Sequence, residues 1–229
     1  NFRFHKISNT KKIRHITKIF KNSSFIVFLH GFMSDLEGEK PNTFLKFAKK
    51  NKLSFLALEY SGHGKSSGKF INGNITKWSN ETSVLIKKFV KKKDFIIIGS
   101  SMGGLSALNT IIEYPDEFGF AGCLSTHWIG IKPWEYLLLP IRQRISGDQD
   151  TIDAIYEYVK ENISTIQNHK VYFDRGTRGL DYLYKKPQED VDKLFLDNNI
   201  NFETQVYKGH DHDPVDFGKR FIPAIEFLL

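Results

Sequence analysis

The chain has 229 residues, 40% of them apolar, and a formal net charge of +7 at pH 7. This length and apolar content favour a single α/β domain with a large core. No run of 18 apolar residues occurs, which argues against a membrane span, and the single cysteine, Cys123, excludes an internal disulfide. The lysines are dispersed and no arginine-rich or aromatic-interleaved stripe occurs, so the charge favours a solvated surface over a nucleic-acid interface.

The cysteine and the amino terminus bear on the cellular compartment. Cys123 lies within the apolar run Phe120–Leu124 and is predicted to be a buried core thiol, which fits a reducing environment. The first residues, Asn1–Lys6, lack the apolar segment of a signal peptide, although the chain starts without Met and a removed leader stays open. We therefore expect a cytoplasmic location.

Apolar runs and helical segments follow one another along the chain. The first two predicted strands, Phe2–Ile7 and Ile13–Phe20, alternate polar and apolar residues as a half-exposed antiparallel pair does. Continuously apolar or β-branched runs predict six more strands, at Phe25–Leu29, Leu53–Leu58, Phe95–Ile98, Phe120–Leu124, Lys170–Phe173 and Phe202–Tyr207. Helices are predicted at Pro41–Asn51, Ile75–Lys92, Met102–Tyr114, Asp148–Ile163, Pro187–Asn198 and within Pro214–Leu229. Eight strands with intervening helices predict one α/β layer domain over residues 1–229.

A long irregular stretch, Ser125–Gly147, follows the sixth predicted strand. It is rich in aromatic residues, including Trp128 and Trp134. One interpretation is a small cap over about residues 126–147 that covers a substrate pocket lined by these tryptophans. The alternative is a loop that packs its own small core.

The segment Gly99-Ser100-Ser101-Met102-Gly103 has the pattern G-x-S-x-G between a predicted strand and a predicted helix. In that setting the pattern builds a nucleophile elbow, in which the central serine adopts a strained conformation and bulk two positions away would collide with it. The alternative is an ordinary glycine-rich turn. The strand, turn and helix around Ser101 favour the nucleophile.

A serine nucleophile needs a base and an acid, in the chain order Ser, Asp, His that the elbow predicts. Of the eight histidines, His210 and His212 lie just beyond the last predicted strand, and the longer loop favours His212. Asp181, on a glycine-bearing loop past the seventh predicted strand, is the first choice for the acid. Asp174, at the end of that strand, is the second choice, and each aspartate has the alternative role of a turn or helix cap.

The oxyanion that forms during acyl transfer needs two backbone N–H donors. Met102, which follows the nucleophile, is expected to supply one, and Phe32, in the turn His30-Gly31-Phe32 after the third predicted strand, the other. We expect His30 to be structural, with its ring bonded to nearby backbone rather than titrating in catalysis.

Two other patterns suggest ligands that the sequence does not support. Gly64-Lys65-Ser66 matches the end of a phosphate-binding P-loop, but the glycine required five residues earlier is Glu59. The run His210-Asp211-His212-Asp213 contains metal-ligand residue types, but alternate positions on one short loop without a distant partner give poor tetrahedral geometry. Neither a metal nor an organic cofactor is expected.

Two regions of the chain resemble two branches of the α/β-hydrolase superfamily. Residues 25–89 resemble small serine hydrolases of the α/β-hydrolase-domain type, on the strings Leu29–Phe32 and Leu58–Gly68 and on Trp78. From Ile97 to the end the chain resembles the esterase family that includes esterase D, on Gly99–Gly104, Tyr114–Phe118, Ser125–Trp128, Tyr172–Thr177, Leu180–Asp181, His212 and Arg220. The resemblance implies the α/β-hydrolase fold, with a mostly parallel eight-stranded sheet, helices on both faces and a small cap after the sixth strand.

The resemblance also bears on the site residues. Both branches place the base at His212, and the esterase branch implies Asp181 as the acid. The other branch usually carries its acid in an H-G-x-x-D string, which this chain lacks. We expect a serine hydrolase that cleaves carboxylic esters, or thioesters, of small-molecule substrates through Ser101, His212 and Asp181. Alternatives are an inactive hydrolase-fold binding protein, a nucleic-acid binder, and a peptidase or carbon–carbon hydrolase, because one fold and triad serve many chemistries.

Overall fold

The computed structural model describes residues 1–90, 95–130 and 148–229. Within them, eight strands form one sheet in the order β1-β2-β4-β3-β5-β6-β7-β8. The antiparallel strands are β1 (Phe2–Lys6), which pairs with β2, and β2 (Lys12–Lys18), which also pairs with β4 (Ser54–Leu58). All other neighbours are parallel: β3 (Phe25–Leu29), β5 (Phe95–Ser100), β6 (Phe120–Leu124), β7 (Lys170–Gly176) and β8 (Asn201–Tyr207). This sheet confirms the predicted fold class.

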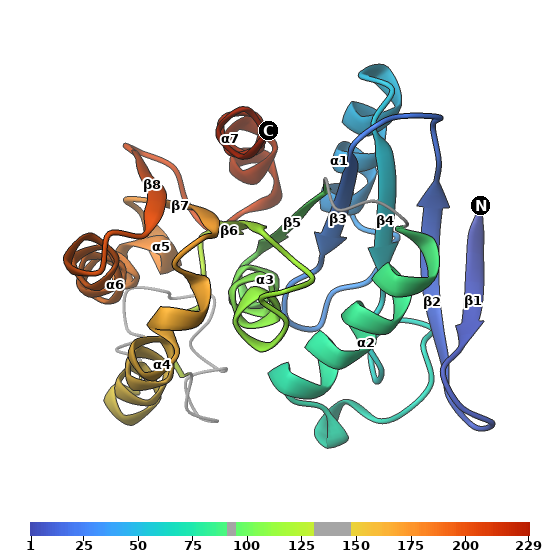
Figure 1. Ribbon diagram of the computed structural model, residues 1–229, viewed down its shortest axis with the longest axis horizontal. Helices are drawn as coiled ribbons and strands as arrows, with labels where there is room; N and C mark the ends of the chain where they lie inside the picture. Colours follow the sequence, from blue (N-terminus) through green and yellow to red (C-terminus); the bar gives the residue numbers. More distant parts are fainter. Residues whose placement is uncertain (91–94, 131–147) are drawn as a thin grey trace.

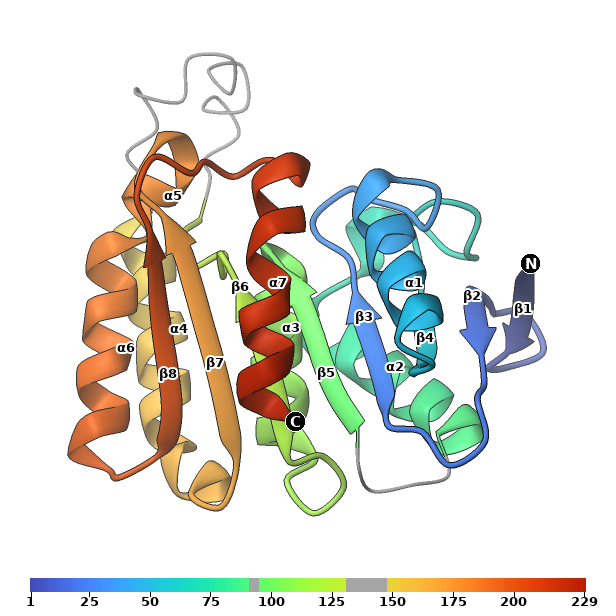
Figure 2. The same cartoon turned by 90° about the horizontal axis from the view of Figure 1, so that it is seen from above.

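Helices cover both faces of the sheet (Figure 1). In Figure 2, α1 (Glu39–Lys50) and α7 (Pro214–Leu228) lie in front of the sheet, and their apolar residues share one core cluster. The other face is covered by α2 (Ile75–Phe89), α3 (Met102–Glu113), α4 (Gln149–Glu161) and α6 (Lys185–Asp197). Two short 3₁₀ segments, η1 (Phe70–Asn72) and η3 (Ile163–Ile166), complete the described elements apart from α5. None of the described helices is both long and apolar enough to cross a membrane.

The central strands are continuously apolar because both of their faces are covered. Along β3, Phe25, Val27 and Leu29 belong to the cluster beneath α2 and α3. Ile26 and Phe28 belong to the cluster beneath α1 and α7. Cys123 on β6 is fully buried in the first cluster, as predicted, and burial raises the pKa of its thiol.

Two elements differ from the prediction in ways that affect the site. Strand β7 continues three residues past Phe173, because it pairs with β8 up to Gly176 opposite Tyr207. Asp174 therefore lies within the sheet instead of at its end. Asp181 lies on the short helix α5 (Gly179–Leu183), where a loop was expected.

The topology places the carboxyl ends of β3 and β5 side by side at the point where the strand order reverses. From β3 the sheet extends to β4 on one side and to β5 on the other. In open α/β sheets, ligands bind outside the carboxyl ends of the strands at such a switch point. The loop after β3 carries Phe32, and Ser101 directly follows β5.

Candidate active site

Ser101 occupies the sharp turn between β5 and α3. Its backbone has φ 61° and ψ −126°, a conformation that a residue with a side chain rarely adopts and that costs about 1–3 kcal/mol. A Cβ on Gly99 would lie 2.1 Å from the carbonyl oxygen of Gly103, and a Cβ on Gly103 would lie 2.2 Å from that of Leu29. The two glycines are thus required by the close approach of β3, β5 and α3, as the elbow pattern predicts.

Backbone hydrogen bonds hold this turn in place from the next strand. The N–H of Ser101 donates to the carbonyl of Leu124 at the end of β6, at 2.9 Å. The carbonyl of Ser101 accepts the N–H groups of Gly104, at 2.9 Å, and His127, at 3.2 Å. These bonds compensate part of the strain and fix where the serine hydroxyl lies.

Ser101 and His212 line the same cavity, of about 560 Å³, which we call the Ser101 cavity. Residues 31–34, in the loop after β3, line one part of it together with Lys40. The remaining lining comes from three other parts of the chain. The segment after β6 supplies His127, Ile129 and Gly130, helix α5 supplies Leu180, and the loop after β8 supplies His212. Segments far apart in the sequence therefore meet around one serine.

His212 is oriented by Asp181. Its Nδ1 lies 2.7 Å from Oδ1 of Asp181, whose side chain is completely buried. Burial lowers the pKa of His212 below its ordinary value, and the charges of Lys40 and Arg220 add to this, while Asp181 opposes it. The imidazole is therefore neutral at pH 7, the form in which it can accept a proton.

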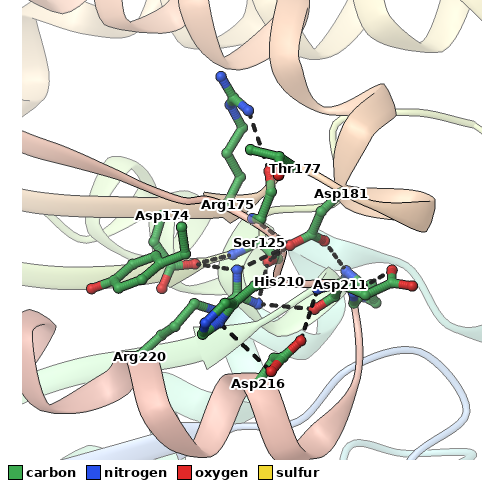
Figure 3. Close-up of polar contacts among 12 residues, drawn as sticks. Ser125, Asp174, Arg175, Thr177, Asp181, His210, Asp211, Asp216 and Arg220 are labelled. Atoms are coloured by element: carbon green, nitrogen blue, oxygen red, sulfur yellow. Dashed lines mark hydrogen bonds and ion pairs between the residues drawn. The ribbon is translucent and has the colours of Figure 1, made fainter.

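The second oxygen of Asp181 accepts three hydrogen bonds. The donors are Oγ of Ser125 at 2.6 Å, the N–H of Gly176 at 2.7 Å and Nη1 of Arg220 at 3.0 Å. Figure 3 shows Ser125 and Arg220 converging on this carboxylate. Burial alone would raise the pKa of Asp181, but the hydrogen bonds and charges of His212 and Arg220 hold it below its ordinary value. Asp181 is accordingly an ionised acceptor at neutral pH.

Asp174 faces different partners. Its Oδ1 accepts the N–H of Ser125 at 2.9 Å and lies 3.7 Å from Nη1 of Arg220. Burial raises the pKa of Asp174 to about 7, against the lowering effect of Arg220. The structure thus brings Asp181, and not Asp174, into hydrogen-bond contact with His212.

His210, the second candidate base, lies outside the Ser101 cavity. Its ring packs on Tyr207, with centroids 5.5 Å apart, and its Nδ1 is 3.7 Å from Oδ1 of Asp216. Its carbonyl accepts the N–H groups of Thr177 and Arg178, both at 3.0 Å. These contacts join the ends of β7 and β8, which is a structural role.

The loop after β3 lies against the elbow. A Cβ on Gly31 would lie 3.3 Å from Cβ of Ser101, so this glycine allows the close approach. Phe32 lines the Ser101 cavity. Met102 is the first residue of α3, so its N–H is one of those that have no hydrogen-bond partner inside the helix. His30 is structural, as predicted: Nδ1 bonds the carbonyl of Gly31 at 2.8 Å, and Nε2 accepts the N–H of Tyr60 at 3.2 Å.

The aromatic residues expected in the pocket are placed differently. Trp128 is 1% exposed, donates through Nε1 to Oε1 of Gln188 at 3.0 Å, and lines a separate cavity beside α4 and α6. The structure therefore does not bring Trp128 into the Ser101 cavity. Trp134, and the part of the expected cap at 131–147, lie outside the described residues.

Two residues that had no predicted role, Arg220 and His127, contribute to the site. Arg220 is completely buried and reaches Ser125, Asp174 and Asp181. His127 lines the Ser101 cavity, with Nδ1 2.7 Å from the hydroxyl of Tyr184. The signal that could have identified Arg220 is its position on the apolar face of α7, beside Phe217, Phe221 and Ala224, where an unpaired cation is unfavourable.

The Gly64-Lys65-Ser66 segment is arranged around a buried carboxylate. The carboxylate of Glu59 accepts hydrogen bonds from the backbone N–H groups of Leu36 and Lys65, and it forms an ion pair with Arg14. A Cβ on Gly64 would lie 2.5 Å from this carboxyl group. Gly64 therefore leaves room for the carboxylate of Glu59, and the backbone N–H of Lys65 binds it, although the two residues resemble the end of a phosphate-binding loop. Among the described residues, no group of three or more His, Cys, Asp or Glu side chains is arranged to hold a metal.

Known proteins resemble this chain in sequence. A family model described as "Putative esterase" matches residues 82–228. The palmitoyl-protein thioesterase ABHD10, mitochondrial, of Rattus norvegicus is 28% identical over 92 residues, which are 40% of this chain and 31% of that protein. The Homo sapiens protein of the same name is 28% identical over 100 residues, 44% of this chain and 32% of that protein. The match therefore spans about a third of the length of these relatives.

Solved structures show the same fold over nearly the whole chain. Mouse α/β-hydrolase domain-containing protein 10 aligns with a TM-score of 0.69 at 19% identity, covering 99% of this chain and 97% of that one. Est1E of Butyrivibrio proteoclasticus, solved with ferulic acid bound, gives 0.66 at 17% identity, covering 98% and 97%. At these identities the structures establish the α/β-hydrolase fold, and the family model covers more than half of the chain. The chain belongs to the esterase family that the model describes, and it has the α/β-hydrolase fold.

Proposed function

We propose that this protein is a serine hydrolase of carboxylic esters or thioesters that works through an acyl-enzyme. The observation that carries the proposal is the Ser101 cavity, which combines a serine in a strained elbow with a neutral histidine bonded to a buried carboxylate. Family membership supports an ester substrate. The thioesterase relatives and the ferulic-acid-bound Est1E support both forms of the substrate.

In the proposed reaction, Oγ of Ser101 attacks the acyl carbon while Nε2 of His212 takes the hydroxyl proton. Asp181 keeps the imidazole in the tautomer with its proton on Nδ1 and stabilises the imidazolium that forms. The N–H groups of Phe32 and Met102 stabilise the oxyanion, each contributing on the order of a hundredfold or more in rate.

The tetrahedral intermediate then collapses and the bond to the leaving alcohol or thiol breaks. His212 gives its proton to that leaving group, which departs and leaves the acyl group on Ser101. A water molecule, deprotonated by His212, attacks the acyl-enzyme and releases the carboxylic acid. Serine and histidine are regenerated, and no redox step or external co-reactant besides water is required.

Turnover of p-nitrophenyl acetate and butyrate, and of a palmitoyl thioester, tests this proposal in the wild type and in Ser101→Ala. We expect the substitution to lower kcat/KM by about 10³-fold or more, because it deletes the nucleophile. Equal turnover by the two proteins would refute the proposal. A fluorophosphonate probe distinguishes the proposed enzyme from an inactive binding protein of the same fold. Covalent labelling requires an activated serine, so we expect the wild type to be labelled and Ser101→Ala not to be.

A further inference from the structure

Lys40 is a cation that lines the Ser101 cavity and forms no ion pair with a carboxylate among the described residues. It lies in the first turn of α1, is partly buried and lines the cavity together with Ser101 and His212. Its Nζ lies 3.8 Å from the centroid of the Phe217 ring. Within the described part of the chain, no hydrogen bond or ion pair to this ammonium accompanies that contact, whereas Lys11 and Lys65 pair with glutamates.

The surroundings of Lys40 make a bound anion favourable. Partial burial removes hydration from the ammonium, and the face of one aromatic ring compensates only part of that loss. Burial lowers the pKa of Lys40 to about 8, and the nearby charge of Arg220 adds to this effect, while the carboxylates of Asp181 and Asp213 oppose it. The side chain therefore remains mostly cationic at pH 7. An anion that enters the cavity would gain a hydrogen-bond donor and a positive charge.

Lys40 lies near His212, the residue that protonates the leaving group in the proposed reaction, and its charge helps to lower the pKa of that histidine. Phe217, which contacts Nζ of Lys40, also packs against the ring of His212, with centroids 5.1 Å apart. His212 must lie next to the leaving oxygen or sulfur, because it delivers the proton to that atom. Phe32, Met33, Ile129 and Leu180 supply apolar lining to the cavity and suit an uncharged acyl group.

We propose that Lys40 binds a negative charge on the leaving half of the substrate, so that the preferred substrates are esters or thioesters of an anionic alcohol or thiol. This inference rests on the function proposed above. It makes Lys40 a specificity-determining residue. The anionic group is a carboxylate or a phosphate, both of which accept hydrogen bonds from an ammonium.

Three aryl butyrates that differ in one substituent test the proposal: 4-(butyryloxy)benzoate, 4-(butyryloxy)phenyl phosphate and the neutral 4-(butyryloxy)benzamide. The readout is the ratio of kcat/KM for each anionic ester to kcat/KM for the amide. In Lys40→Met we expect this ratio to fall about tenfold for at least one anion, because a charge-assisted hydrogen bond is lost. The ester whose ratio falls more identifies the anion class.

Two further variants separate a specific contact from other effects. Lys49→Met removes the same charge from an exposed position on the same helix and should leave each ratio within twofold of wild type. Lys40→Arg keeps the charge and should retain most of the preference. If Lys40→Met does not fold, the neutral variant Lys40→Gln replaces it, and ratios unchanged from wild type in Lys40→Gln would overturn the proposal.

The outcomes also separate this inference from the proposed function. Turnover of all three esters that survives Ser101→Ala would refute the serine mechanism. Ser101-dependent turnover with ratios unchanged in Lys40→Met, or with the three activities lowered equally, would overturn only the role of Lys40.

Discussion

Asp174 and Asp181 lie on neighbouring elements around one arginine, yet their environments give them opposite protonation behaviour. Asp181 accepts hydrogen bonds on both oxygens and carries the lower pKa. Asp174 accepts one N–H on Oδ1, and its buried Oδ2 has no hydrogen-bond partner among the described residues, so burial raises its pKa to about 7. The difference follows from the number of donors that each carboxylate receives.

Asparagine substitutions at the two positions should therefore have unequal effects. Asp181→Asn should lower kcat by about 10³–10⁴-fold, because the amide no longer enforces the imidazole tautomer or stabilises the imidazolium. Asp174→Asn should cost less than tenfold, because the asparagine oxygen can still accept the N–H of Ser125. Butyrate ester kinetics measure both, with urea unfolding to show that each variant is folded. A larger loss in Asp174→Asn would contradict the arrangement of partners described here.

At the scale of elements, the site depends on three backbones meeting where β5 turns into α3. Gly103 lies at the narrowest point, because its missing Cβ leaves room for the carbonyls of Leu29 and His30. Gly103→Ala should lower the free energy of unfolding by about 1–3 kcal/mol or more, since a methyl group must push β3 away from α3. It should also lower esterase turnover, because Ser101 shares this turn.

Gly119 supplies the matched control for that substitution. A Cβ added there meets no atom of the described residues within 4 Å, so Gly119→Ala should change the free energy of unfolding by about 0.5 kcal/mol or less. Urea denaturation of both variants measures the difference. Equal stabilities would show that β3 and α3 can separate at no cost, against the close approach seen in the structure.

At the scale of the whole molecule, buried histidines set the response to acid. Burial lowers the pKa of His15 to about 4 and that of His30 to about 3. The unfolded chain takes up these protons near pH 6.5, whereas the folded protein does not. Each histidine thus contributes stability that is complete above pH 6.5 and is lost, by about 1.4 kcal/mol per pH unit, as the pH falls toward the folded-state value.

His15→Gln should remove one such contribution. The free energy of unfolding of the variant should fall less steeply than that of wild type between pH 6.5 and 4.5, by about 1.4 kcal/mol per unit. Asp174 acts in the opposite direction, because its pKa is raised, so the comparison is made between the two proteins rather than from one curve. Urea unfolding of both proteins at pH 7, 5.5 and 4.5 measures the difference. If the free energies of unfolding of the two proteins changed equally with pH, His15 would not be buried in the neutral form.

The sequence by itself determined the fold class, the elbow geometry and the structural role of His30, because these depend on local patterns. Apolar runs bury central strands on both faces, and two glycines beside a serine signal a turn that tolerates no bulk. It also limited the candidates for the proposed base to two histidines and those for the proposed acid to two aspartates, since the position after a strand limits which side chains can reach the elbow.

Only the tertiary structure decided which of these candidates meet and which cations accompany them. Asp174 lies inside the sheet because β7 pairs with β8 to its end, while α5 turns Asp181 toward His212. Arg220 and Lys40 enter the site from helices on the same face of the sheet, α7 and α1, which are separated by more than 160 residues of chain. Such contacts depend on the packing of distant elements, which the local pattern of a single sequence does not encode.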